Sequence, residues 1–263
     1  MAANPSDAVV IAVDGPVRIV TLNRPDTLNA ADAELHRAIT EVWADLARDT
    51  DARAIVLTGA GKAFSAGGDF GLLQTMIDDV DVRAATLEEG KTLVRSMLAI
   101  EIPIVGAVNG PAVGLGCSLV SLCDLVLIAA DAHLADPHVA LGLVAADGGA
   151  ISWPFLTGLL RAKEHLILGT RISAQEAVDA GLATRISADP VGEAVELAHR
   201  IAALPPQSVT ETKQLLNAGL RAAVGQFLDD AIAAESRSFD TPELQANLTK
   251  LRAAARPAPP QKR

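Results

Sequence analysis

Two short apolar segments of the chain each run directly into a glycine-rich loop. Residues 55–58 (IVLT) precede the loop GAGKAFSAGGD at 59–69, and residues 104–108 (IVGAV) precede the loop NGPAVGLGCS at 109–118. An apolar run of four or five residues that ends at a turn signal is typical of a buried strand. Glycine after such a strand permits a positive φ and lets a backbone N–H approach a ligand closely. The pattern predicts an α/β fold with two exposed backbone loops.

The regions around these loops divide the chain into two parts of different character. Residues 9–13 and 17–22 predict a β-hairpin around Asp14-Gly15, and Asn29 is expected to cap the helix that follows. Beyond residue 200 the pattern is almost entirely helical, and it ends in a helix expected from Pro242 to about Ala255. We therefore expect a core over residues 1–200, a C-terminal helical region over 201–255 and a disordered tail over 256–263.

Composition excludes several classes of protein. The 263 residues are 50% hydrophobic, which can fill a sizeable core, and the net charge of −10 argues against binding nucleic acid or an anionic membrane. No apolar run approaches the roughly 20 residues of a membrane span, and the start MAANPSDAV lacks a leader pattern. The two cysteines, Cys117 and Cys123, suit a reducing compartment. These features predict a cytoplasmic enzyme.

The two loops have a chemical interpretation and a structural one. Backbone N–H groups from both loops, converging on one carbonyl oxygen, would form an oxyanion hole. Alternatively, each loop is only a tight turn. A phosphate loop is excluded because a single residue separates Gly59 from Gly61, and Ala63 follows Lys62 where that motif needs serine or threonine.

Taken together, five ordered segments resemble the crotonase (enoyl-CoA hydratase/isomerase) superfamily. The resemblance covers nearly the whole chain from Val17 onward. The segments are TLNRPDTLNA (21–30), IVLTGAGKAFSAGGDF (55–70), AVNGPAVGLGCSL (107–119), CDLVLIAADAHLADPHVALGLVAADGG (123–149) and RISAQEAVDAGLATRI (171–186). The resemblance implies a spiral of ββα repeats, followed by C-terminal helices that assemble the chain into a trimer or a dimer of trimers.

The same resemblance implies an acyl-CoA thioester as substrate, with no metal and no cofactor apart from the CoA carried by the substrate. The oxyanion-hole donors would be the backbone N–H groups of Gly68 and Leu115. Leu115 replaces the glycine common at that position, but it keeps the backbone donor if its φ stays negative. The residues expected to contact CoA or substrate are Leu28, Ala66, Gly68, Asp69, Phe70, Gly71 and Leu115.

The sequence departs from a hydratase at the two positions where the family carries catalytic glutamates. Ser118 and His138 stand there instead. His138, in an Asp-Pro-His sequence, is followed by Asp147, and a carboxylate beside an imidazole fixes its tautomer and stabilises its cation. We therefore expect His138 and Asp147 to be the catalytic acid/base residues. Glu88 and Glu89 are candidates for a substitute carboxylate.

The leading interpretation is an enoyl-CoA hydratase/isomerase-family enzyme that stabilises an enolate in the oxyanion hole, as in fatty acid metabolism. One alternative is a hydrolase that cleaves a carbon–carbon bond of a β-dicarbonyl compound with the His138–Asp147 pair, because the Asp-Pro-His pattern is similar to that branch of the family. Another is a non-catalytic binding or assembly subunit. The retention of both glycine loops favours an enzyme.

Overall fold

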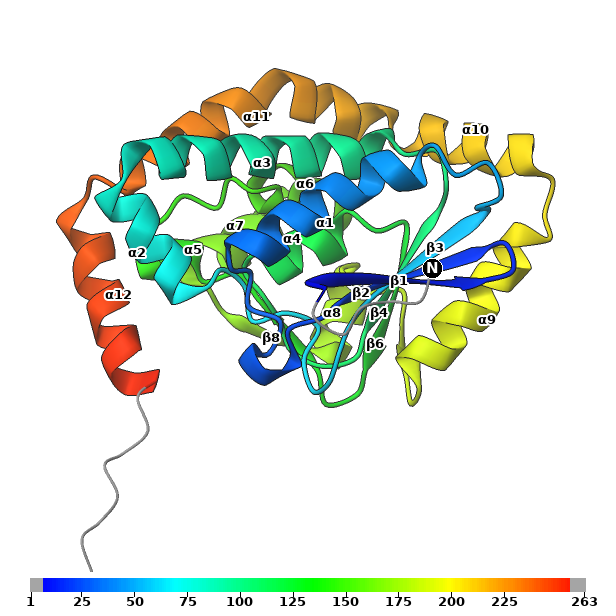
Figure 1. Ribbon diagram of the computed structural model, residues 1–263, viewed down its shortest axis with the longest axis horizontal. Helices are drawn as coiled ribbons and strands as arrows, with labels where there is room; N and C mark the ends of the chain where they lie inside the picture. Colours follow the sequence, from blue (N-terminus) through cyan, green and yellow to red (C-terminus); the bar gives the residue numbers. More distant parts are fainter. Residues whose placement is uncertain (1–6, 256–263) are drawn as a thin grey trace, which may run out of the picture.

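The computed structural model describes residues 7–255, which form two β-sheets surrounded by helices (Figure 1). Within these residues the larger sheet has six strands in the order β1-β2-β3-β4-β6-β9, and the smaller has three in the order β5-β7-β8. The strands are β1 (Val9–Asp14), β2 (Val17–Leu22), β3 (Ala54–Gly59), β4 (Ile104–Val108), β5 (Ala112–Val113), β6 (Leu125–Ala129), β7 (His133–Ala135), β8 (Arg171–Ser173) and β9 (Arg185–Ser187). The tail expected over 256–263 lies outside the described residues.

Helices cover both faces of the larger sheet and extend beyond it. They are η1 (Pro25–Thr27), α1 (Ala33–Leu46), α2 (Phe70–Asp78), α3 (Val80–Ala99), α4 (Leu115–Ser121), α5 (His138–Leu141), α6 (Gly149–Thr157), α7 (Leu159–Leu168), α8 (Ala174–Ala180), α9 (Pro190–Ala202), α10 (Pro206–Leu216), α11 (Ala218–Ser238) and α12 (Pro242–Ala255). None of the helices in the described part of the chain is both long enough and apolar enough to cross a bilayer.

In two successive pairs of strands, the first strand lies in the larger sheet and the second lies in the smaller sheet. β4 lies in the larger sheet and β5 in the smaller, and α4 follows; β6 and β7 are divided in the same way before α5. The chain is therefore α/β with consecutive ββα units, as predicted. The predicted hairpin is present, with Asp14 paired to Val17 at its turn.

The central strand β3 is buried along its whole length. Its side chains alternate between two apolar clusters: Ile55 and Leu57 pack on the side of α1 and α3, and Ala54 and Val56 pack on the side of α9. Burial on both faces explains why this strand reads as a continuous apolar run. Since β3 and β4 are parallel neighbours, the two glycine loops leave the sheet at the same edge.

The prediction that Asn29 caps the first helix is wrong. Asp32 is the cap, and its carboxylate accepts a hydrogen bond from the Leu35 N–H at 2.8 Å. Asn29 is instead fully buried in a left-handed conformation with φ of 55°. Its side chain bonds the backbone of three residues, Arg24, Ala60 and Ala63, and so ties the segment after β2 to the first glycine loop.

The C-terminal helices pack against the core at two places. Helix α11 lies along α3 and also contacts α6, whereas α12 lies at one end of the molecule against α2 and α5 (Figure 1). Leu220, Val224, Leu228 and Ile232 form the buried stripe of α11. This packing brings the C-terminal part of α11 to the end of α3 at which α2 lies (Figure 1).

Candidate active site

The two glycine loops touch each other through backbone. Val113 N–H donates to the Ser65 carbonyl at 2.9 Å, forming a single-residue bridge between the loops. Gly67 has φ of 89°, and a Cβ placed on it would lie 2.8 Å from the Val113 carbonyl oxygen. A Cβ on Gly114 would lie 3.8 Å from the Gly67 Cα. Glycine is therefore required at position 67 by both conformation and close approach.

The amides of Gly68 and Leu115 lie beside this contact. Among residues 7–255, neither N–H has a hydrogen-bond acceptor, although the neighbouring Gly67 carbonyl and Asp69 N–H are both bonded to Ala31. Leu115 is the first residue of α4, where N–H groups have no acceptor within the helix. Leu115 also keeps an ordinary φ, because the non-glycine residues with positive φ in the described chain are Leu28 and Asn29. Both amides therefore remain available to a ligand.

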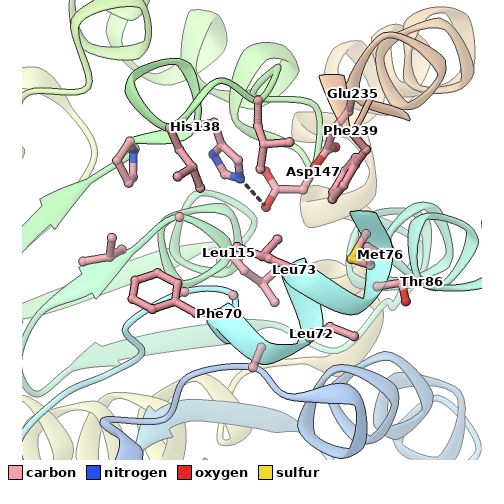
Figure 2. Close-up of a pocket in the computed structure, with 18 of the residues that line it drawn as sticks. Phe70, Leu72, Leu73, Met76, Thr86, Leu115, His138, Asp147, Glu235 and Phe239 are labelled. Carbon is pink, nitrogen blue, oxygen red and sulfur yellow. Dashed lines mark ion pairs between the residues drawn. The ribbon is translucent and has the colours of Figure 1, made fainter. Parts of the chain in front are cut away.

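Both residues line a cavity of about 520 Å³, whose walls are largely apolar (Figure 2). Helix α2 contributes Leu72, Leu73 and Met76, and Phe239 closes the opposite side. Lys250 of α12 also lines the cavity. A largely apolar pocket with a few polar groups at one place is the usual form of a small-molecule site.

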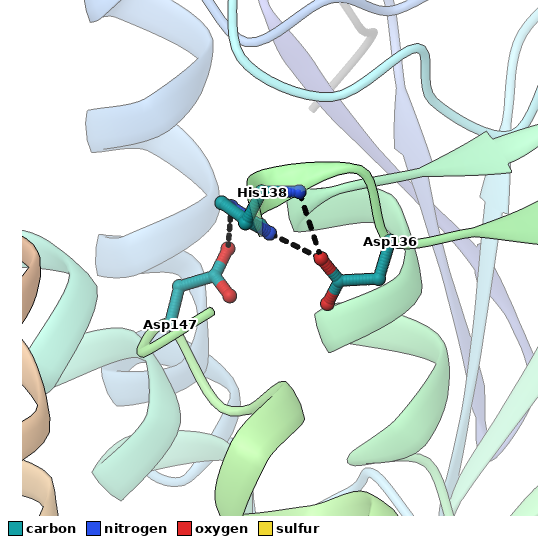
Figure 3. Close-up of side chains that lie close together, drawn as sticks. All are labelled: Asp136, His138 and Asp147. Carbon is teal, nitrogen blue, oxygen red and sulfur yellow. Dashed lines mark hydrogen bonds and ion pairs between the residues drawn. The ribbon is translucent and has the colours of Figure 1, made fainter. Parts of the chain in front are cut away.

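His138 stands between two carboxylates at the polar side of this cavity (Figure 3). Its Nδ1 lies 2.5 Å from Asp136 Oδ1, and its Nε2 lies 3.6 Å from Asp147 Oδ2. The Ser118 hydroxyl donates a hydrogen bond to Asp147 Oδ1 at 2.8 Å. A carboxylate from another segment thus bonds the short side chain at position 118. The segment Asp136–His138 and the loop before α6 meet here because α6 packs against α4.

The charges in this cluster control its protonation. Burial opposes the imidazolium, but Asp147 and Asp136 outweigh it and raise the pKa of His138 to about 10. Burial also raises the pKa of Asp147, although His138 and the Ser118 hydrogen bond oppose that change. At neutral pH His138 is therefore an imidazolium paired with carboxylates. It can donate a proton or stabilise negative charge, while the carboxylate of Asp147 is the group of the pair that can accept a proton.

The comparisons with known proteins show which family the chain belongs to. Residues 13–251 match the sequence profile of the family described as enoyl-CoA hydratase/isomerase. The chain belongs to that family. It is 31% identical over 234 residues to a short-chain-enoyl-CoA hydratase of Clostridium acetobutylicum, an alignment that covers 88% of this chain and 87% of that protein.

Two mycobacterial proteins extend the likeness to the enoyl-CoA hydratase/isomerase family. The chain is 37% identical over 216 residues to the probable enoyl-CoA hydratase EchA14 of Mycobacterium tuberculosis, covering 81% of this chain and 82% of that protein. The crystal structure of an enoyl-CoA hydratase/isomerase from Mycobacterium paratuberculosis matches with a TM-score of 0.91 and 52% identity, covering 93% of this chain and 98% of that one. The predicted crotonase-like fold is confirmed.

The family resemblance assigned seven residues to CoA or substrate, and the structure places them in two groups. Ala66, Gly68, Phe70 and Leu115 line the cavity, whereas Leu28, Asp69 and Gly71 lie outside its lining. Asp69 caps α2, and its carboxylate accepts hydrogen bonds from the Gly71 and Leu72 N–H groups at 2.7 and 3.1 Å. Contact of these seven residues with CoA stays a prediction.

The cluster of Asp136, His138 and Asp147 could also be considered for a metal, since each offers one ligand atom and these atoms lie within 4.8 Å of one another. Histidine binds a metal only as neutral imidazole. Here Nδ1 is bonded to Asp136, and the two carboxylates hold the ring in its cationic form. The donor set fits an ion-pair network better than a metal site.

Sequence reasoning missed two acidic residues of this site. Asp136 bonds His138 Nδ1 and so orients the ring, the role that we expected of Asp147, whereas Asp147 lies near the other ring nitrogen, Nε2. Glu235 of α11 lines the cavity and is buried. The signal for Glu235 was present, because it continues the helical spacing of the apolar stripe that ends at Leu228 and Ile232.

The substitute carboxylates suggested by the sequence, Glu88 and Glu89, do not line the cavity. Glu89 is bonded to Nδ1 of His36 at 2.8 Å, and Glu88 pairs with Lys91 on the same helix. Both glutamates are therefore engaged in ion pairs with residues of α1 and α3. The additional carboxyl at the cavity comes from the C-terminal region of the chain instead.

Proposed function

We propose that the protein acts on an enoyl-CoA thioester by stabilising an enolate in an oxyanion hole formed by the amides of Gly68 and Leu115. The observation that carries the proposal is the contact of the two glycine loops at the wall of one cavity, where these two N–H groups have no acceptor in the described part of the chain. Two donors that meet the thioester oxygen stabilise the negative charge that develops there, and this lowers the barrier to reaction at the α and β carbons.

Proton transfer is assigned to Asp147, and stabilisation of negative charge is assigned to His138. Asp147 accepts a proton from water or from substrate, because its raised pKa makes it a better base than an ordinary aspartate. His138 stays protonated between Asp136 and Asp147, so it holds the site's positive charge and stabilises the anionic intermediate. A pKa of about 10 argues against His138 as the base that activates water, the role that the β-dicarbonyl hydrolase alternative needs.

The direct test is a kinetic assay with crotonyl-CoA, following the loss of the enone absorbance. We expect steady turnover by the wild-type protein and binding of acetoacetyl-CoA as a competitive ligand. Cleavage of a cyclic 1,3-diketone without action on crotonyl-CoA would contradict the proposal. Binding of CoA thioesters without any turnover would favour the non-catalytic alternative.

We expect the homotrimer or dimer of trimers that the family resemblance implies, and exposed apolar side chains support association of the chain. Helix α7 exposes several large apolar side chains, including Leu160 at 82% and Leu168 at 62% of its full area. Phe155 of α6 is exposed next to this helix in the chain. Contiguous exposed apolar residues mark association surfaces. Sedimentation velocity should show a trimer or hexamer; a monomer at micromolar concentration would contradict this expectation.

A further inference from the structure

Glu235 of α11 is a buried acidic residue at the cavity. It is 6% exposed, and its Oε2 has no hydrogen-bond partner among the described residues. It follows Leu228 and Ile232 on the buried face of α11, where an apolar side chain would satisfy the packing. Buried polar atoms without partners are rare in folded proteins, and each needs an explanation.

The position of Glu235 supplies that explanation. Its side chain lines the same cavity as the Gly68 and Leu115 amides. Figure 2 shows it on the side of Asp147, next to Phe239 and across from Met76 of α2. The Glu235 side chain therefore borders the space that a substrate would occupy, together with Asp147.

The two carboxyls lie in different electrostatic environments. Burial and the nearby Asp147 raise the pKa of Glu235 to about 8, so Glu235 holds a proton. Asp147 lies against the His138 imidazolium, which favours its ionised form. Two carboxyls whose environments hold one protonated and one ionised are suited to acid and base roles in one reaction.

Within residues 7–255, no nearby cation offsets the effects that raise the pKa of Glu235. The α3 cations Arg83, Lys91 and Arg95 are paired with Asp240 or Asp229. On α1, His36 is paired with Glu89. The charges that act on Glu235 are those of Asp147 and Asp136, which raise its pKa, and that of His138, which lowers it. Lys250 of α12 also lines the cavity.

We propose that Glu235 is a second catalytic carboxyl, which donates its proton to the α carbon of the enolate. This rests on the proposed function. Asp147 takes a proton from water as the water oxygen bonds to the β carbon, and the C=C electrons move to form the enolate. The enolate then takes the Glu235 proton at the α carbon and the thioester C=O bond is restored. The proton held by Asp147 returns to Glu235, so the cycle balances without an outside acid.

The test compares Glu235→Gln with wild type and with Glu196→Gln, which makes the same change at an exposed position on α9. With crotonyl-CoA, Glu235→Gln should lower kcat by about 100-fold or more, the usual contribution of a general acid. KM should change by less than about threefold, because the lost interaction acts in the transition state. Glu196→Gln should match wild type in both constants.

The pH profile separates a catalytic role from a structural one. The wild-type kcat should fall above about pH 8 as Glu235 loses its proton, and the residual rate of Glu235→Gln should lack this limb. Glu235→Asp, which keeps an acid, should retain it. A kcat for Glu235→Gln near the wild-type value, or a wild-type profile without this limb, would overturn the role of Glu235 and leave the proposed function standing. A wild-type protein that does not turn over crotonyl-CoA would overturn both. Circular dichroism checks that the variants are folded.

Discussion

Replacing Gly68 isolates the contribution of one backbone amide. A proline at this position removes the N–H, and that N–H has no acceptor among residues 7–255, so no structural hydrogen bond is lost with it. Alanine keeps the N–H, and its Cβ would meet only the Leu73 side chain at 3.8 Å, an ordinary contact. Gly68 is also not in a left-handed conformation, so alanine adds no backbone strain.

The expected effect is large for proline and small for alanine. Loss of one oxyanion-hole donor costs about 3–4 kcal/mol of transition-state stabilisation, or a 100- to 1,000-fold drop in kcat. We expect a loss of this size with crotonyl-CoA for Gly68→Pro, and less than about tenfold for Gly68→Ala because its donor remains. Thermal melts of both variants check that the loops are intact. Equal activities of two folded variants would refute the assignment of this amide to the oxyanion hole.

Three further predictions concern stability. His138 and Glu235 hold protons more tightly in the folded state than in the unfolded state, because folding raises their pKa values to about 10 and about 8. Their stabilising contributions are therefore present at low pH and are lost as the pH rises through these values. The free energy of unfolding in urea should fall from pH 7 to pH 10, and a flat profile would contradict this prediction. Asn29→Ala should lower the free energy of unfolding by about 3–4 kcal/mol, because it removes three hydrogen bonds and places alanine at a positive φ. Asn29→Gly should cost about 1 kcal/mol less, because glycine adopts a positive φ without strain. Equal losses in urea unfolding would contradict the contribution of the positive φ. Gly225→Ala on α11 and Gly90→Ala on α3 should each stabilise by up to about 1 kcal/mol, since a Cβ meets no atom within 4 Å at either site. Only Gly90→Ala should also lower kcat/KM for longer acyl chains, because Gly90 lines the cavity.

The sequence predicted those elements whose burial in the folded protein produces a recognisable run of apolar residues. Strands β3 and β4 are buried throughout and read as apolar runs, as predicted. The strands of the smaller sheet have only two or three residues, too few to show a period of two. The error at Asn29 has a similar cause: asparagine suits both a helix cap and a left-handed turn, and buried contacts decide between them.

The candidate site likewise has one part that the sequence predicts and one part that it does not. His138 and Asp147 lie in one short stretch of sequence, so their proximity could be expected, and they lie within 3.6 Å of each other. Glu235 reaches the cavity only because α11 packs along α3, and no pattern near residue 138 or 147 contains that information. The raised pKa of His138 also depends on two carboxylates acting together, which no spacing rule predicts.

The hydrogen bonds around the glycine loops have a consequence for protein engineering. The Ala66 N–H is bonded to the Leu28 carbonyl at 2.9 Å, the Ser65 hydroxyl to the Asn29 carbonyl at 2.8 Å, and the Val113 N–H to the Ser65 carbonyl at 2.9 Å. The first loop is thus hydrogen-bonded to two other segments, one at Leu28 and Asn29 and the other at Val113. A graft of this loop alone into another scaffold would leave its backbone unsupported. The smallest transplantable module comprises all three segments, although Leu28 and Asn29 do not line the cavity.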